Sequence, residues 1–398
     1  MRLRQRAGIR TGRAQQAAPL HNGRCRGAAC CALAVPSTRR TRRGLRPALA
    51  LILAGTLLAA CQSAPAAPAG TAAAPAAPAA APAQAAASPA APASVPFSVA
   101  PRAIHISITS EGLQFLPLRI AVTEGFFAQH GLDAELHRID ANAGHAGLMS
   151  GQFDYLASFS RVINSNMHGI PVRFVAALVD RPMHVLIARP EIKSFDDLRG
   201  KNVGVSSPGG VEDFIMRTIL RANGLDPDRD ANVYPAGQGA LAAVESNQLQ
   251  AIGLQPPQST QLERRGYNVL GRAAALLPDL ALTATATTAE RVQNNPADVK
   301  AFVAGYLEAL RFLHTDREGA ARVASAWLDL PLDVALAAYD ESIDTFSTDG
   351  SFAEATLRRG VEIEHEKDPT LTWDRPVTDM VASDVLAEVQ RALGFKGE

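Results

Sequence analysis

Short loops rich in hydroxyl, amide and guanidinium groups are the part of this sequence best suited to chemistry. Each loop follows a stretch of apolar or alternating residues. The loops are 110–114, 158–161, 180–182, 206–210 and 255–257. Side chains of these types, together with free backbone N–H groups, form hydrogen bonds to small polar molecules. The pattern therefore predicts a ligand site assembled from several loops.

Residues of these loops are the candidate ligand contacts. They are Ser110, Glu111, Gln114, Phe115, Ser158, Phe159, Ser160, Arg161, Arg181, Ser206, Ser207, Gly209, Gly210 and Gln255. The segment from Ser206 to Gly210 is the most informative, because two hydroxyls and two glycines precede the start of a helix. The alternative for this segment is an ordinary helix N-cap with a tight turn and no ligand.

The chemistry of the ligand stays open between two classes. An anionic ligand would pair with Arg161 and Arg181 through charge-assisted hydrogen bonds. A heteroaromatic ligand such as a pyrimidine would stack on Phe115 and Phe159. The alternatives are that the two arginines form surface or interlobe ion pairs and that the two phenylalanine rings belong to the core.

Catalytic motifs are incomplete in this chain. Ser206 lacks the glycine two positions later that a nucleophile elbow requires. No Walker A lysine follows Gly209 and Gly210, and the nine histidines form no HExxH pair. We therefore expect a binding protein without catalytic residues, a cofactor or a metal site.

Alternating strand and helix patterns must position these loops. We expect strands at 104–110, 133–139, 155–158, 172–179, 183–188, 202–205, 232–234, 251–254, 268–270 and 280–288, with helices at 116–124, 159–168, 211–222 and through the C-terminal third. This order predicts an α/β protein with mostly parallel sheets. Ligands of open α/β sheets bind beyond the carboxyl ends of the strands, where all of these loops would lie.

The N-terminal hundred residues predict export and attachment to a membrane. Five arginines between Arg39 and Arg46 precede an uncharged run that is shorter than a spanning helix. Leu58-Ala59-Ala60-Cys61 resembles a bacterial lipobox, although an ordinary cleavage site followed by Cys is the alternative. We expect residues 1–60 to be removed, Cys61 to be lipidated, and 61–103, rich in Ala and Pro, to form a disordered linker.

Charge and cysteine placement restrict the partners of the remaining domain. Thirteen of the 39 basic residues precede Glu111 and none of the 39 acidic residues does, so the rest of the chain carries 26 basic and 39 acidic residues. This acidic balance argues against nucleic acid, whose affinity rests on basic contacts to phosphate. All four cysteines lie at or before Cys61, so the domain has no disulfide or thiolate metal site.

Several stretches resemble one family of substrate-binding proteins. The segment 117–136, including Glu124-Gly125-Phe126-Phe127, resembles the first-helix signature of the nitrate, sulfonate, taurine and thiamine-pyrimidine (NMT1-like) uptake family. The motifs that follow in the same order are Gly151–Asp154, Asp197–Val205, Asn223–Asp226 and Gln255–Pro257. The resemblance covers 104 to about 325.

The resemblance implies a type II periplasmic-binding fold, with an interlobe cleft and a helical C-terminal region. Lobe 1 would comprise 104–188 and, after the return, 281–398, with lobe 2 at 189–280. It also implies a monomeric, extracytoplasmic protein that passes a small solute to an ABC permease, with Phe126 and Phe127 as core residues. A ligand sensor for a signalling partner is the alternative. An enzyme like the related pyrimidine synthases is less favoured, because their chemistry uses His and Cys and this domain has no Cys.

Overall fold

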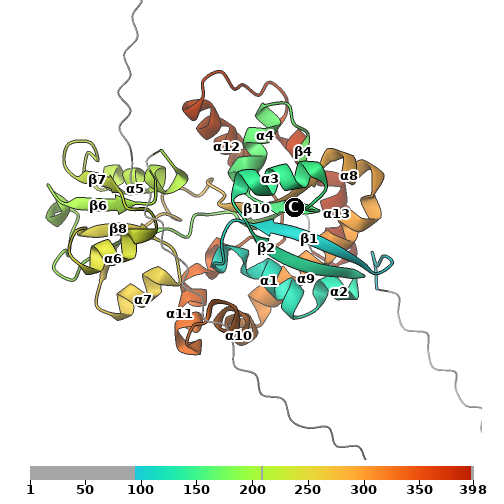
Figure 1. Ribbon diagram of the computed structural model, residues 1–398, viewed down its shortest axis with the longest axis horizontal. Helices are drawn as coiled ribbons and strands as arrows, with labels where there is room; N and C mark the ends of the chain where they lie inside the picture. Colours follow the sequence, from blue (N-terminus) through green and yellow to red (C-terminus); the bar gives the residue numbers. More distant parts are fainter. Residues whose placement is uncertain (1–94, 208, 396–398) are drawn as a thin grey trace, which may run out of the picture. The chain divides into compact units, whose positions relative to one another are not determined.

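Two five-stranded sheets organise the protein in a computed structural model that describes residues 95–207 and 209–395 (Figure 1). The expected signal peptide, the lipidated Cys61 and most of the expected linker lie outside the described residues. We refer to the first sheet with its helices as lobe 1 and to the second as lobe 2.

The sheet of lobe 1 has the strand order β2-β1-β3-β10-β4. Its strands are β1 (Arg102–Ile108), β2 (Leu132–Arg138), β3 (Tyr155–Ala157), β4 (Val172–Val179) and β10 (Thr283–Thr288). Strand β1 runs parallel to β2 and β3, whereas β10 runs antiparallel to β3 and β4. Ile104, Ile106 and Ile108 share one buried face of β1, and Ser107 on the opposite face is buried as well.

The sheet of lobe 2 has the order β7-β6-β8-β5-β9. Its strands are β5 (Val185–Ala188), β6 (Asn202–Val205), β7 (Asn232–Pro235), β8 (Ala251–Leu254) and β9 (Asn268–Arg272). Strand β6 is parallel to β7 and β8, and β5 is antiparallel to β8 and β9. In each sheet the fourth strand in order, β10 or β5, is antiparallel to its neighbours, and the other four strands run in one direction.

Helices cover both sheets and form the C-terminal third. They are α1 (Leu116–Thr123), α2 (Phe126–Gln129), α3 (Ala141–Ser150), α4 (Phe159–Met167), α5 (Val211–Ala222), α6 (Ala240–Glu245), α7 (Gln258–Arg264), α8 (Ala289–Asn294), α9 (Pro296–Thr315), α10 (Arg317–Leu328), α11 (Leu332–Ser342), α12 (Glu354–Lys367) and α13 (Ser383–Ala392). Short 3-10 turns span Leu113–Phe115, Asp196–Leu198, Gly237–Gly239, Ile343–Thr345 and Val377–Met380. Among the described residues, no helix combines the length and the apolar character that crossing a bilayer requires.

The central helix of the lobe 1 core is α9. Its Phe302 ring stacks on the ring of Tyr155 at a centroid distance of 3.7 Å and on that of Phe127 at 5.1 Å. The hydroxyl of Tyr306 donates to the carbonyl of Ala177 in β4 at 2.7 Å. This packing anchors the C-terminal helices to the first sheet, and the buried Phe127 has the core role expected for it.

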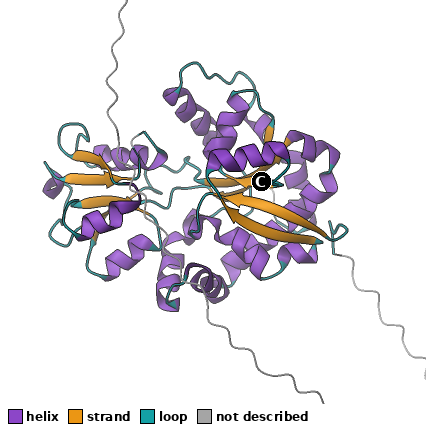
Figure 2. Ribbon diagram, in the orientation of Figure 1, coloured by secondary structure: helices purple, strands orange, loops and turns teal. Residues whose placement is uncertain are grey.

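Two connecting segments, 180–184 and 273–282, cross between the lobes. The chain leaves β4 at Val179 and starts β5 at Val185, which lies opposite Leu254 at the carboxyl end of β8. It returns from Arg272, also opposite Val185, to Thr283, opposite Val179. Figure 2 colours both connecting segments as loops. The carboxyl edges of the two sheets are therefore the edges at which the lobes are joined.

The structure confirms the α/β fold with two sheets and a helical C-terminal region, and it corrects two boundaries. Strand β1 begins at Arg102, and the preceding residues pack on lobe 1 through a hydrogen bond from the Val99 N–H to the carbonyl of His130 at 3.1 Å. The end of the expected linker, 95–103, therefore belongs to the fold. Strand β5 pairs within the second sheet, so the crossover precedes Val185 instead of following residue 188.

Candidate ligand-binding site

Parallel pairing brings three loops of lobe 1 to one edge. Ile108 at the end of β1 lies opposite both Arg138 of β2 and Ala157 of β3. The β1 loop and the starts of α3 and α4 consequently lie next to one another. This arrangement brings together the predicted contacts from 110–114 and 158–161.

Arg161 is the most prominent polar group at this edge. Its Nη1 donates to Oδ1 of Asn142 at 3.3 Å, whereas its buried Nε has no hydrogen-bond partner within the described part of the chain. His145 of α3 is buried, and its Nε2 is also unpartnered there. Burial, and secondarily the charge of Arg161, lowers the pKa of His145. Lobe 1 thus offers a guanidinium donor and an imidazole whose protonation is disfavoured.

The serine hydroxyls of the lobe 1 loops differ in whether they already form hydrogen bonds within the protein. The Gln114 side-chain amide donates to Oγ of Ser110 at 2.9 Å, and Glu111 is exposed. Ser158 occupies the N-cap position of α4 without a capping hydrogen bond from its side chain. Ser160 is exposed on the first turn. The Ser158 hydroxyl therefore has capacity for a ligand.

The two candidate stacking rings lie in the core. Phe115 is 2% exposed and Phe159 4% exposed. Phe159 stacks on Phe174 at a centroid distance of 5.2 Å. Burial of this degree leaves no ring face for a ligand, so the core alternative describes both residues.

In lobe 2, two acidic residues of α5 accept hydrogen bonds from backbone N–H groups of the preceding loop. The Ser206 N–H donates to Oε1 of Glu212 at 3.1 Å, and the Gly209 N–H donates to Oδ2 of Asp213 at 2.8 Å. Burial raises the pKa of Glu212. These two N–H groups are thus occupied, while the side chains of Ser206 and Ser207 are exposed. The loop therefore presents the hydroxyls of Ser206 and Ser207 instead of a row of free N–H donors.

A buried polar pair lies where the first crossover meets lobe 2. Nε2 of Gln255 lies 2.9 Å from Nε2 of His184. The His184 residue is 4% exposed. Burial lowers the pKa of His184 to about 4, so its ring is neutral. Oε1 of Gln255 and Nδ1 of His184 are buried without partners among the described residues. Buried polar atoms are normally satisfied, which makes this pair a candidate for contact with a ligand or a water molecule.

The side chain of Arg181 contacts other residues of the protein. Its guanidinium donates to the backbone carbonyl of Asp344, and its Nε lies 3.7 Å from Oδ1 of Asp180. Burial raises the pKa of Asp180. The side chain of Arg181 ties the crossover to the segment after α11, in keeping with the ion-pair alternative.

A cavity of about 360 Å³ lies between the start of α5 and the end of α12. Its lining includes Gly209, Gly210, Phe214, Ile363 and Lys367. The guanidinium of Arg359 in α12 lies 5.2 Å from the centre of the Phe214 ring. Gly209 and Gly210 are the predicted contacts that line it, so helix α12 contributes to the space between the lobes.

Sequence reasoning missed three residues of this region, namely Asn142, His145 and His184. His184 lies in an apolar run that predicts only a core strand, and Asn142 and His145 lie within a helix rather than in a loop after a strand. Their position became evident only from the pairing of the strands. A search for polar residues inside otherwise apolar segments would have singled out His184.

Two α/β lobes joined by paired crossovers at facing carboxyl edges define a type II periplasmic-binding fold. The chain belongs to the NMT1/THI5-like family, whose model matches residues 113–320. This assignment confirms the resemblance proposed from the motifs.

Relatives and solved structures agree with this assignment. The riboflavin-binding protein RibY of Chloroflexus aurantiacus is 27% identical over 208 residues, which are 50% of this chain and 58% of RibY. A putative sulfonate ABC transporter component, the periplasmic sulfonate-binding protein SsuA of Methylobacillus flagellatus, superposes with a TM-score of 0.61 at 20% identity, covering 75% of this chain and 96% of SsuA. The periplasmic nitrate-binding protein NrtA of Synechocystis superposes with a TM-score of 0.55 at 17% identity, covering 75% of this chain and 91% of NrtA.

These proteins are named as binding proteins and not as enzymes, in agreement with the non-catalytic protein expected from the sequence. The chain spans little more than half the length of RibY.

Proposed function

We propose that this chain is a lipid-anchored, extracytoplasmic solute-binding protein that captures a small solute between its lobes and delivers it to an ABC importer. The observation that carries the proposal is the set of unsatisfied polar atoms at the joined carboxyl edges: Nε of Arg161, Nδ1 of His184 and Oε1 of Gln255. The names of RibY, SsuA and NrtA support the same class of function.

The distribution of donors and acceptors suggests the kind of solute. Arg161 would receive an acceptor group of the ligand, such as a carboxylate, sulfonate or nitrate oxygen. Lobe 2 offers Oε1 of Gln255, a buried acceptor without a partner among the described residues. We therefore favour a solute that carries an acceptor group at one end and N–H or O–H donors at the other.

A thermal-shift screen of the full chain tests capture. The ligands are nitrate, taurine, alkanesulfonates, pyrimidines and riboflavin. A true ligand at 100 times its dissociation constant stabilises the folded state by about 2.7 kcal/mol. We expect Arg161→Gln to abolish most of the shift, while the control Arg322→Gln, at an exposed position of α10, leaves it unchanged. A screen without any shift, or identical shifts in both variants, would refute this site.

Anchoring is tested separately through Cys61. Metabolic labelling with a fatty acid is expected to label the wild-type chain and place it in the membrane fraction. A Cys61→Ser variant should lose both the label and the membrane association. A labelled Cys61→Ser variant would refute the proposed lipidation while leaving solute capture untouched.

A further inference from the structure

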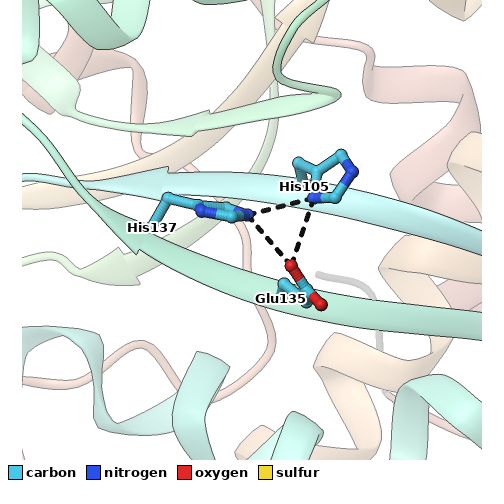
Figure 3. Close-up of side chains that lie close together, drawn as sticks. All are labelled: His105, Glu135 and His137. Carbon is cyan, nitrogen blue, oxygen red and sulfur yellow. Dashed lines mark hydrogen bonds and ion pairs between the residues drawn. The ribbon is translucent and has the colours of Figure 1, made fainter. Parts of the chain in front are cut away.

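Three potential metal ligands lie side by side on strands β1 and β2 of lobe 1 (Figure 3). His105 of β1 is paired directly with Glu135 of β2, and His137 is two residues further along β2. Residues paired across strands and residues two apart on one strand share a face of the sheet. The neighbouring Ile104 and Ile106 face the core, so the half-exposed His105 lies on the opposite face of the sheet.

The three ligand atoms form a compact triangle. Nδ1 of His105 lies 3.0 Å from Nε2 of His137 and 3.6 Å from Oε2 of Glu135, and Nε2 of His137 lies 3.5 Å from the same oxygen. The point equidistant from the three atoms is about 2.0 Å from each, which equals the usual Zn–N and Zn–O bond lengths of about 2.0–2.2 Å. An ion would fit close to the plane of the triangle without rearrangement of the strands.

The donor set and the exposure define which ions would bind. Two imidazole nitrogens and one carboxylate oxygen are typical ligands of Zn²⁺ and neighbouring divalent transition metals. The side chains of His105, Glu135 and His137 are 40%, 63% and 38% exposed, so an ion can reach them directly. A fourth coordination position would face the solvent.

The surroundings hold the ligands in place. The backbone N–H of His105 donates to Oδ2 of the buried Asp154 at 2.8 Å, which fixes this point of β1, and the ring of His137 packs on Phe153 at a centroid distance of 5.5 Å. The Phe153 contact limits the orientations of the His137 ring and so reduces the ordering needed on binding. The triangle lies within the strands, whereas the ligand-binding loops follow the strand ends.

We propose that His105, Glu135 and His137 form a surface site for Zn²⁺ or a similar divalent transition metal, which links the edge strand β2 to β1. The sequence predicted no metal site, because that expectation rested on ligands close together in the chain. Here His105 and the pair on β2 are brought together only by strand pairing. The site does not depend on the proposed solute-binding function.

Equilibrium dialysis of the full chain against ZnCl₂ tests the site. All samples have affinity tags removed and Cys25, Cys30, Cys31 and Cys61 alkylated, so that thiols do not contribute. We expect the wild type to bind one more Zn²⁺ per chain than His137→Asn, and Glu135→Gln to weaken that binding at least tenfold. His168→Asn, which removes an exposed histidine elsewhere on lobe 1, is the matched control and should behave like the wild type.

A second readout separates binding from misfolding. Zn²⁺ is expected to raise the melting temperature of the wild type and of His168→Asn but not of His137→Asn, and all three metal-free proteins should melt alike. If His137→Asn is itself unstable, the exposed Glu135→Gln alone decides the matter. Equal Zn²⁺ affinity and stoichiometry in the wild type and Glu135→Gln would overturn the proposal, whatever the outcome of the solute screen.

Discussion

At the scale of single residues, Asp154 serves the fold although it belongs to a motif of the family. Its Oδ1 accepts from Arg102 at 2.8 Å and from Arg291, and its Oδ2 accepts from the His105 N–H. Its backbone carbonyl accepts from Thr287 at 2.8 Å. The buried carboxylate therefore joins the start of β3 to β1 and α8, and the backbone carbonyl adds a link to β10.

Removing this carboxylate should be costly. We expect Asp154→Ala to lower the free energy of unfolding by about 2–3 kcal/mol, because Arg102 and Arg291 would lose a buried counter-charge. Urea unfolding measures the change. The control Glu318→Ala removes an exposed partner 3.8 Å from Arg322 and should cost less than about 1 kcal/mol. Equal losses in the two variants would contradict this role.

His184 should make stability depend on pH. Burial lowers its pKa from 6.5 to about 4, so between these values the unfolded chain binds a proton that the folded protein does not. The contribution of His184 is fully present above pH 6.5 and is lost as the pH falls toward 4. From pH 7 to pH 5 the loss amounts to about 2 kcal/mol.

Urea unfolding of the wild type and of His184→Asn at both pH values isolates this contribution. The variant has no titrating group at this position, so its loss of stability between the two pH values should be smaller by the same amount. An equal loss in both proteins would show that His184 is not held neutral in the folded state.

At the scale of elements, local patterns predicted most strands and helices well. Strands β4, β6 and β8 and helix α5 have the expected bounds. Apolar periodicity and Gly at helix ends are local signals, which explains this success. Sheet membership is not local: β5 pairs with β8 and β9, more than 60 residues later in the chain. Its apolar residues alone could not indicate which lobe it joins.

The turn from β6 into α5 shows a second limit of local patterns. Glu212 and Asp213 suit the first turn of a helix because they interact favourably with its N-terminal N–H groups. In the folded protein they also reach back to Ser206 and Gly209. Either these carboxylates or a bound ligand could accept from the N–H groups of Ser206 and Gly209. The sequence is compatible with both arrangements, and only the structure shows that the carboxylates do so.

At the scale of the whole molecule, Glu341 connects the lobes. It lies on α11 of lobe 1 and accepts from Thr260 of α7 at 2.6 Å and from Arg272 of β9 at 2.6 Å. Arg264 and Asp333 form a further ion pair between the same two helices. Domain closure in such folds requires contacts that break and reform between lobes, and this set is a candidate for that role.

Loss of these contacts should favour separation of the lobes. We expect Glu341→Ala to accelerate amide hydrogen exchange in the crossovers 180–184 and 273–282 about tenfold, which corresponds to about 1.4 kcal/mol. Mass spectrometry of exchanged peptides measures the rates. Asp340→Ala, whose partner Arg317 lies in the same lobe, is the control. Unchanged exchange in Glu341→Ala would exclude a role in holding the lobes together.

The sequence by itself determined the α/β class, the family and most element bounds, because these depend on periodicity, turn residues and short motifs that act locally. Only the tertiary structure decided which side chains are available to a ligand. Phe115 and Phe159 lie in the core, Arg181 binds the carbonyl of Asp344, and His184 has a buried nitrogen without a partner among the described residues. Only the pairing of β1 with β2 brings His105, Glu135 and His137 together. Availability depends on burial and on partners distant in the chain, and both arise only when strands pair and lobes pack.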